Sequence, residues 1–319
     1  MTTSTPTFVF PQELKPEGTI GIVSPGSWAQ PEWINATTEI LQELGYSTVV
    51  HSQNYLRQGR LAGNDAARAE AINDMFADST IDAIMCARGG FGTIRIIDKI
   101  NYKLIKRNPK PFIGFSDATI LLHSVGRRCG LITYHGPMCK SMALPHDKRT
   151  ITDLLTVVGE SEDKRVEIHY PEVEVHCAGK VEGILTGGNI SLLQSLMGTH
   201  YDWSAKDSIL FIEETDEPLY KIDLMLRHFA LAGRLKGVKA VLVGEMTNIE
   251  DGDPEAKEAT GLPYGVDLKQ ILLDVLPPDT PLCFNFPCGH GEYMTTLPVG
   301  AYAHLTLDSC GAHMSFVVA

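Results

Sequence analysis

The 319-residue sequence lacks any long hydrophobic run, and no stretch approaches the roughly 18 apolar residues that a membrane-spanning helix needs. Positive charge is also scarce, because 27 Lys and Arg residues stand against 39 Asp and Glu residues, for a formal net charge of −12. Binding to a nucleic-acid backbone or to an anionic membrane needs a basic surface. We therefore expect neither nucleic acid nor a membrane as a partner.

Paired cysteines are absent as well. The seven cysteines are scattered, and none forms a Cys-x-x-Cys motif. Reduced thiols in a cytoplasmic protein are the expected state, and no metal site is indicated. The first 18 residues contain neither the basic segment nor the long apolar segment of a secretory signal, which also favours the cytoplasm.

Strand-like and helix-like segments alternate through the first half of the chain. Short apolar runs predict strands at Thr19–Ser24, Ser47–His51, Ile81–Ala87 and Pro111–Gly114. Helical spacing of apolar residues predicts helices at Pro31–Leu44, Asp65–Phe76, Thr93–Ile100 and Asp117–Cys129. This alternation predicts a parallel sheet covered by helices on both faces. Such sheets bind ligands beyond the carboxyl ends of their strands, so the loops after residues 24, 87 and 114 are candidate sites.

The character of the sequence changes after the first 150 residues. A charged stretch at 160–165 predicts a linker over 151–178, between domains at 1–150 and 179–319. Strands are expected in the second domain at Lys180–Leu185, Ser208–Glu213, Ala240–Glu245, Leu297–Val299 and Ala301–Leu307, with helices near Ile190–Met197 and Leu219–Ala232. We predict an α/β protein with an amino-terminal, flavodoxin-like parallel-sheet domain and a carboxy-terminal mixed β/α domain.

The segment Gly114-Phe115-Ser116-Asp117-Ala118 lies between a predicted strand and a predicted helix, which is the setting of a nucleophile elbow. An elbow exposes its hydroxyl above the sheet edge, near a helix N-terminus that favours an oxyanion. Ala118 stands where the common pattern has glycine, and a serine at this place can also simply cap the helix. Ser116 is a candidate nucleophile on this interpretation.

A glycine-rich loop, Arg88-Gly89-Gly90-Phe91-Gly92, follows the third predicted strand. Glycines let the backbone approach a ligand and direct N–H groups at negative charge, although a tight strand-to-helix turn is the alternative. The loop is expected beside Ser116 on the same sheet edge. The N–H of Gly89 or Gly90, paired with that of Asp117, could then form an oxyanion hole.

A serine nucleophile needs a base and an acid that orients the base. Glycines flank His290 in Gly289-His290-Gly291-Glu292, a loop that can present an imidazole, while His135 is the competing candidate. Two acids, Glu213 and Glu214, end an apolar strand, and strand alternation lets only one of them point into a site.

These pieces, in this order, resemble the LD-carboxypeptidase family of serine peptidases, which includes the muramoyltetrapeptide carboxypeptidases. The resemblance extends from about Gly18 to Leu307 and depends on several motifs in register. They are Ser24-Pro25, Arg88-Gly89-Gly90-Phe91-Gly92, Asn108-Pro109-Lys110, Gly114-Phe115-Ser116-Asp117, Tyr134-His135-Gly136-Pro137, Thr186-Gly187-Gly188-Asn189, the acids at 213–214 with Glu217-Pro218-Leu219-Tyr220, and Gly289-His290-Gly291-Glu292.

The resemblance implies a catalytic triad of Ser116 as nucleophile, His290 as general base and Glu213 as its carboxylate, with Glu214 taking that place if the alignment slips by one residue. It also implies a homodimer that needs neither a metal nor an organic cofactor. The implied substrate is a muropeptide, whose terminal D-alanine is released by hydrolysis of an L,D-peptide bond during peptidoglycan recycling.

Two alternatives stay open. A sister branch resembles microcin C immunity peptidases, which cleave a peptidyl-aminoacyl nucleotide with the same triad. A non-enzymatic ligand-binding protein of two α/β domains is the other. For a carboxypeptidase, Arg88 is the best-placed residue to bind a terminal carboxylate through a bidentate guanidinium, although an ion pair beneath the loop would explain it equally well.

Overall fold

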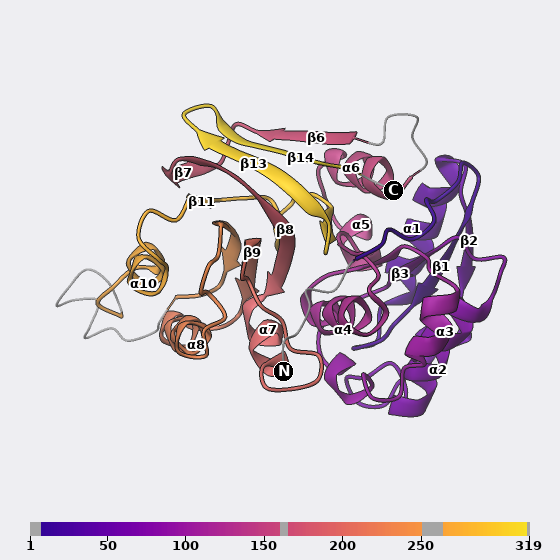
Figure 1. Ribbon diagram of the computed structural model, residues 1–319. Coiled ribbons are helices and arrows are strands. Elements are labelled where there is room, and N and C mark those ends of the chain that lie inside the picture. Colours follow the sequence, from indigo (N-terminus) through magenta and orange to yellow (C-terminus); the bar gives the residue numbers. More distant parts are fainter. Residues whose placement is uncertain (1–7, 160–164, 251–263, 318–319) are drawn as a thin grey trace.

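The computed structural model describes residues 8–159, 165–250 and 264–317. The chain builds two sheets that lie side by side, the first drawn mainly in indigo and purple and the second in pink, orange and yellow (Figure 1). Most of the charged stretch that predicted a linker, residues 160–164, lies outside the described residues.

The first sheet has six strands in the order β12-β5-β4-β3-β1-β2. Their bounds are β1 (Thr19–Val23), β2 (Ser47–Val50), β3 (Ala83–Cys86), β4 (Phe112–Gly114), β5 (Thr133–His135) and β12 (Leu297–Val299). The first five strands run parallel, whereas β12 returns from the far end of the chain and pairs antiparallel with β5. Four parallel strands were expected here, so the predicted α/β class is confirmed.

Helices cover both faces of this sheet because successive strand residues point to opposite sides. In β1, Val23 faces a core shared with α2 (Asp65–Ala77) and α4 (Thr119–Cys129), while Ile20 and Ile22 face a core shared with α1 (Pro31–Glu43) and α6 (Arg149–Val158). Two short helices, α3 (Tyr102–Arg107) and α5 (Cys139–Ala143), complete this half.

The prediction of a helix at Thr93–Ile100 is wrong. Only a short 3-10 turn forms, at Thr93–Arg95. Four of the five residues at 93–97 are β-branched, and such side chains lose rotamer freedom against a preceding helical turn.

The second sheet has eight strands in the order β6-β14-β13-β8-β9-β10-β11-β7. Their bounds are β6 (Arg165–Tyr170), β7 (Glu174–Cys177), β8 (Gly179–Asn189), β9 (Ser208–Thr215), β10 (Ala240–Thr247), β11 (Leu282–Phe284), β13 (Tyr302–Asp308) and β14 (Gly311–Val317). Among the described strands, β8, β9, β10 and β11 form the parallel pairs and the other neighbours pair antiparallel, so the sheet is mixed as predicted. Its helices are α7 (Ile190–Leu196), α8 (Leu219–Leu231) and α10 (Leu268–Val275).

The expected linker at 151–178 instead contains most of α6 together with β6 and β7, and both strands belong to the second sheet. Alternation explains β6, because Val166 and Tyr170 are buried while the residues between them reach the surface or lie half-buried. The division of the chain into two domains stays a prediction.

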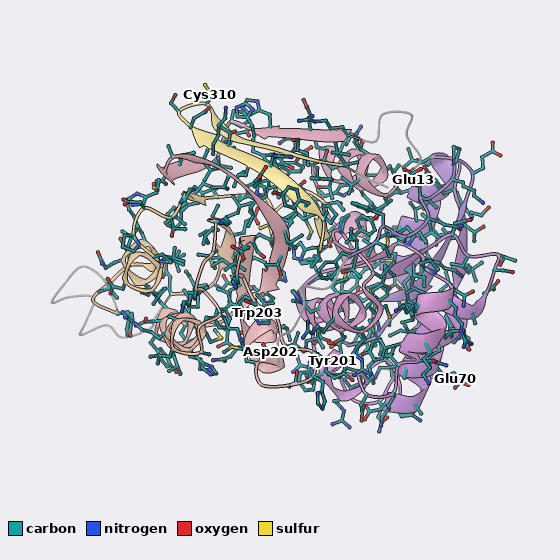
Figure 2. All side chains as sticks on the ribbon, viewed as in Figure 1. Glu13, Glu70, Tyr201, Asp202, Trp203 and Cys310 are labelled. Carbon is teal, nitrogen blue, oxygen red and sulfur yellow. The ribbon has the colours of Figure 1, made fainter. Side chains whose placement is uncertain are left out.

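Five of the seven cysteines are buried, and Cys310 is exposed at the tip of the β13–β14 hairpin (Figure 2). No described helix is long and apolar enough to cross a membrane.

The two halves meet closely at the end of β8. A side chain at Gly188 would lie 2.6 Å from a side-chain carbon of Thr119 on α4, and the N–H of Asn189 donates to the Thr119 hydroxyl at 3.3 Å. At Gly187 the φ angle is +145°, and a Cβ would overlap the carbonyl oxygen of Phe211 on β9. Glycine is therefore required here for sheet pairing as well as for the backbone angle.

We expect Gly187→Ala to lower the free energy of unfolding by about 2–3 kcal/mol, because the added Cβ must push against backbone that cannot rotate away. The measurement is denaturant unfolding of both proteins. Gly198→Ala is the control, since Gly198 also has a positive φ, +76°, but nothing lies within 4 Å of its Cβ position. A smaller loss for Gly187→Ala than for Gly198→Ala would contradict the packing argument.

Candidate active site

Ser116 occupies a sharp turn at the carboxyl end of β4. Its φ angle is +58°, which is unusual for a residue with a side chain and marks stored backbone strain. The turn continues as a 3-10 segment, Ser116–Ala118, into α4. A Cβ at Gly114 would lie 2.9 Å from that of Ala118, so the strand and helix join without space for a larger residue. This geometry is that of a nucleophile elbow.

The glycine-rich loop after β3 lies against this elbow. A Cβ at Gly89 would lie 2.9 Å from the Ser116 hydroxyl oxygen and 3.2 Å from the Asp117 nitrogen. Gly90 has a φ of +97°, and in the described part of the chain neither its N–H nor that of Gly89 donates to another protein group. The loop and the elbow are therefore in contact, as expected from the sequence, while the oxyanion hole formed by Asp117 with Gly89 or Gly90 stays a prediction.

The Asp117 side chain is fully buried beneath this contact and ties the loop to the elbow. Its Oδ2 accepts the Thr93 N–H at 3.1 Å, and the Thr93 hydroxyl donates to the Asp117 carbonyl at 2.6 Å. Burial raises the pKa of Asp117 to about 6. Arg68, also fully buried, donates to the carbonyls of Pro25 and Gly92 at 2.6 and 2.8 Å. These contacts fix the loop that the sequence marked only by its glycines.

His290 lies beside the elbow, with its ring centroid 4.9 Å from that of Phe115. Its Nδ1 donates to Glu213 Oε2 at 2.8 Å, and the Glu213 side chain is completely buried whereas the imidazole is 23% exposed. A carboxylate that accepts from Nδ1 leaves Nε2 as the nitrogen able to take a proton. Within the described residues no hydrogen bond joins His290 to Ser116, and catalytic contacts often tighten only when substrate binds.

The neighbouring acid, Glu214, points away from the imidazole. Its carboxylate accepts from the Asn189 amide at 2.8 Å, from the Ser191 N–H at 2.9 Å and from the Ser191 hydroxyl at 2.6 Å. The alternation of β9 thus gives the two acids separate tasks, and it is Glu213 that reaches His290.

His135, the competing base, is buried away from the pocket. Its Nε2 donates to the Cys288 carbonyl at 2.7 Å, and burial lowers its pKa to about 4. A neutral histidine in this place supports the loop that carries His290.

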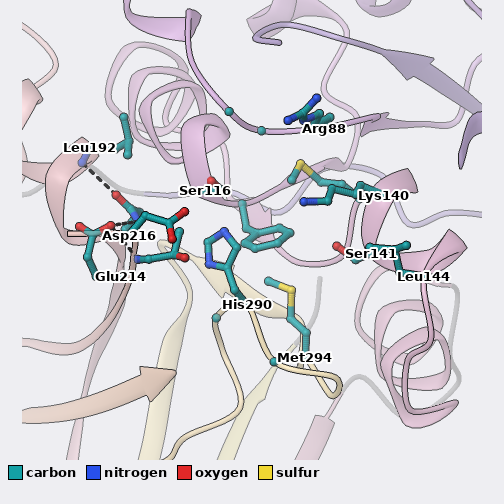
Figure 3. A pocket seen from close by; sticks show the side chains of 18 of the residues that line it. Arg88, Ser116, Lys140, Ser141, Leu144, Leu192, Glu214, Asp216, His290 and Met294 are labelled. Carbon is teal, nitrogen blue, oxygen red and sulfur yellow. Dashed lines mark hydrogen bonds between the residues drawn. The ribbon is translucent and has the colours of Figure 1, made fainter. Parts of the chain in front are cut away.

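A pocket of about 640 Å³ opens above Ser116 and His290, between the carboxyl ends of β3 and β4 and those of β8 and β9. Charged side chains line it on two sides of the imidazole, with Arg88 and Lys140 on one and Glu214 and Asp216 on the other (Figure 3). Lys140 and Asp216 were not predicted, because each stands alone in a loop or short helix and carries no motif.

Arg88 lines the pocket and is half-buried. Its Nη1 donates to the Trp28 carbonyl at 3.0 Å, and its guanidinium carbon lies 5.5 Å from the centre of the Trp33 ring. Among the described residues Arg88 forms no ion pair with a carboxylate, and its charged neighbour is Arg60, so an ion pair beneath the loop does not explain Arg88 there. The described ranges contain no group of three His, Cys, Asp or Glu side chains that could hold a metal ion.

Comparison with known proteins identifies the family. Residues 20–136 match the LD-carboxypeptidase N-terminal domain, and residues 182–305 match the LD-carboxypeptidase C-terminal domain. The chain belongs to the LD-carboxypeptidase family. The resemblance inferred from the motifs is thereby confirmed, and the protein is a serine-type carboxypeptidase.

Two relatives of this LD-carboxypeptidase match it over most of their lengths. A probable murein peptide carboxypeptidase of Bacillus subtilis is 33% identical over 92% of this chain and 90% of its own. A murein tetrapeptide carboxypeptidase of Pseudomonas aeruginosa is 27% identical over 91% of this chain and 93% of its own.

Solved structures show the same two-sheet fold. A muramoyltetrapeptide carboxypeptidase from Oxalobacter formigenes superimposes with a TM-score of 0.78, at 25% identity, over 94% of this chain and 98% of its own. The microcin C7 self immunity protein MccF in its apo state gives a TM-score of 0.84 at 23% identity, over 98% of both chains.

The Glu213–His290 contact predicts a specific pH dependence. Burial alone would lower the pKa of His290, but the hydrogen bond and charge of Glu213 outweigh it and raise the pKa. Because only the neutral imidazole accepts a proton, activity should fall as pH drops through a value above about 6.5. Glu213→Gln removes the charge, so the acid limb of kcat/KM should move to lower pH, and kcat should fall by roughly 10²- to 10⁴-fold.

The matched control is Glu214→Gln, one residue away on the other face of β9. It should move the acid limb much less, since Glu214 makes no hydrogen bond to the imidazole and its charge raises the pKa of His290 less than that of Glu213 does. A larger shift for Glu214→Gln than for Glu213→Gln would show that Glu214, and not Glu213, is the acid that acts on His290.

Proposed function

We propose that this protein is a serine carboxypeptidase that hydrolyses the L,D-peptide bond before the terminal D-alanine of muropeptides, converting tetrapeptide to tripeptide in peptidoglycan recycling. The observation that carries the proposal is the arrangement of Ser116 on a strained elbow beside His290, whose Nδ1 donates to the buried carboxylate of Glu213 at 2.8 Å. The relatives named for murein peptides support the choice of substrate.

The reaction follows from the atoms that face the pocket. His290 Nε2 takes the proton from the Ser116 hydroxyl as its oxygen attacks the scissile carbonyl. The N–H groups of Asp117 and of Gly89 or Gly90 receive the oxyanion, while Glu213 stabilises the imidazolium. The intermediate expels the amine of D-alanine, which takes the proton from His290. Water, activated by the same imidazole, then hydrolyses the ester and restores Ser116.

The charges of the pocket support cleavage at a free C-terminus. Arg88 and Lys140 lie on the same side of the imidazole, and a planar guanidinium binds a carboxylate through two parallel hydrogen bonds. This side would hold the carboxylate of the departing D-alanine. We also propose that the protein acts in the cytoplasm, as the sequence predicts, and as a homodimer, as the family resemblance implies.

A microcin C immunity-type peptidase is the alternative, in which the same three residues cleave a peptidyl-aminoacyl nucleotide. The likeness to MccF at 23% identity is one of fold alone, whereas the murein peptide relatives are related along most of the chain. Offering both substrate classes to the purified protein distinguishes the two activities.

Ser116→Ala should reduce kcat on a muropeptide tetrapeptide by at least ~10³-fold, because no other group can form the ester, while the fold is retained. The measurement is product mass over time with wild-type and variant proteins, alongside labelling by a fluorophosphonate probe and thermal melting. Turnover near the wild-type rate in Ser116→Ala would contradict a serine mechanism. Cleavage of the nucleotide substrate but not of the tetrapeptide by the wild type would establish the alternative.

Arg88→Ala should weaken cleavage of a free-acid tetrapeptide about ten- to a hundred-fold in kcat/KM. The physical reason is the loss of a charged hydrogen-bonded pair at a partly desolvated site, which costs about 1.5–3 kcal/mol. The C-terminal amide of the same peptide is the matched control substrate, since it lacks the charge that Arg88 would bind. Equal losses on acid and amide would place Arg88 in the scaffold and assign carboxylate binding to another residue.

A further inference from the structure

A half-buried carboxylate, that of Glu245, lies beside the loop that carries His290 and takes no part in the chemistry described above. Glu245 is near the carboxyl end of β10, next to β9, which carries Glu213. It is not among the residues that line the pocket. Any effect of Glu245 on the reaction must therefore be transmitted through the residues that it contacts.

An irregularity in the sheet directs Glu245 toward the histidine loop. Val243 pairs with Ile212 and Met246 pairs with Glu214, so two residues of β10, Gly244 and Glu245, lie opposite Glu213 alone. An extra residue of this kind is a β-bulge, and bulges turn a side chain out of the regular alternation, often beside active sites. The bulge here stands opposite the carboxylate that binds His290.

The loop that carries His290 rests on the Glu245 carboxylate. The Gly289 N–H donates to Glu245 Oε2 at 2.6 Å. A Cβ at Gly289 would lie 2.8 Å from that oxygen, and a Cβ at Gly291 would lie 2.6 Å from the other oxygen, Oε1. The two glycines that flank His290 are thus explained by contact, because a side chain at either position would force the loop and the Glu245 carboxylate apart, by movement of one or the other.

The other side of the loop is held by groups already described. His135 donates to the Cys288 carbonyl, and a Cβ at Gly244 would lie 2.6 Å from the Cys288 sulfur, so the backbone of β10 lies against the Cys288 side chain. His290 itself is joined to Glu213 by a single hydrogen bond and is partly exposed. Its position relative to Ser116 consequently depends on where the loop backbone is fixed.

We propose that Glu245 is a positioning residue for His290: its carboxylate anchors the Gly289–Gly291 loop and so holds the imidazole between Glu213 and Ser116. The inference rests on the proposed use of His290 as the base for Ser116. It does not depend on which peptide is cleaved. Burial and the nearby charge of Glu213 raise the pKa of Glu245, which fits a carboxylate enclosed between β9 and the loop.

The test measures how fast a fluorophosphonate probe acylates Ser116, because that step needs the base but not the natural substrate. Glu245→Ala should lower the maximal labelling rate about 10- to 100-fold, as displacement of a catalytic group by about 1 Å does, with the probe concentration for half-maximal rate unchanged. Glu245→Gln keeps an oxygen that can accept from Gly289 and should label close to the wild-type rate. Thermal melting of each protein serves as the control for folding.

Gly291→Ala supplies a second, independent variant. It should slow labelling about tenfold in the wild-type background, since its Cβ disrupts the contact between the loop and the Glu245 side chain. In the Glu245→Ala background the same change should cost little more, because all three of the nearest atoms to that Cβ belong to Glu245. This non-additivity separates positioning through Glu245 from a general loss of packing.

Wild-type labelling by a stably folded Glu245→Ala protein would overturn the proposal. So would an equal cost of Gly291→Ala in both backgrounds, or a Glu245→Gln protein that labels as slowly as Glu245→Ala. If Glu245→Ala does not fold, Glu245→Asp decides, since it withdraws the carboxylate by one methylene and should still slow labelling. A wild type that is labelled at Ser116 but cleaves no muropeptide would refute the proposed function and leave this inference standing.

Discussion

The hydrogen bond between Glu213 and His290 is the contact on which the rest of the site depends. A carboxylate with no exposed surface is costly to bury unless it is paired, and His290 provides the pairing at 2.8 Å. The same bond selects the imidazole tautomer with a free Nε2 and raises the pKa of the ring against the effect of burial. One interaction therefore satisfies a buried charge, orients the base and sets its titration range.

That contact is useful only because the two sheets bring it to Ser116. The carboxyl ends of β3 and β4 supply the glycine-rich loop and the elbow, whereas β9 and the 288–291 loop supply the acid and the base. Glycine allows the halves to approach at Gly188 against Thr119, and it allows close contacts within each half at Gly89 against Ser116 and at Gly291 against Glu245. The strand β12, which crosses back to the first sheet after the histidine loop, further joins the halves.

Features that depend on local sequence were predictable, whereas those that depend on distant pairing were not. The strand–serine–helix pattern around Ser116 and the glycines of residues 89–92 each depend on a few neighbouring residues. The alternation of β9 likewise implies that Glu213 and Glu214 face opposite ways. The strands β6 and β14 pair across more than a hundred residues, so the local sequence of β6 predicts only a linker. Lys140 and Glu245 carry no local pattern, and their places at the site come from a short helix and a β-bulge.

The central claim is that residues from the two sheets act together to form an ester on Ser116. The most direct test is rapid acid quenching of the protein during hydrolysis of a tetrapeptide, followed by mass spectrometry of the intact chain and its fragments. The account predicts a tripeptidyl group bound to the hydroxyl oxygen of Ser116. Because deacylation also needs the base, this group should persist longer, once formed, in a His290→Ala protein. An acyl group on any other residue would contradict the account. So would product formation with no covalent adduct detected under quenching conditions that preserve an ester.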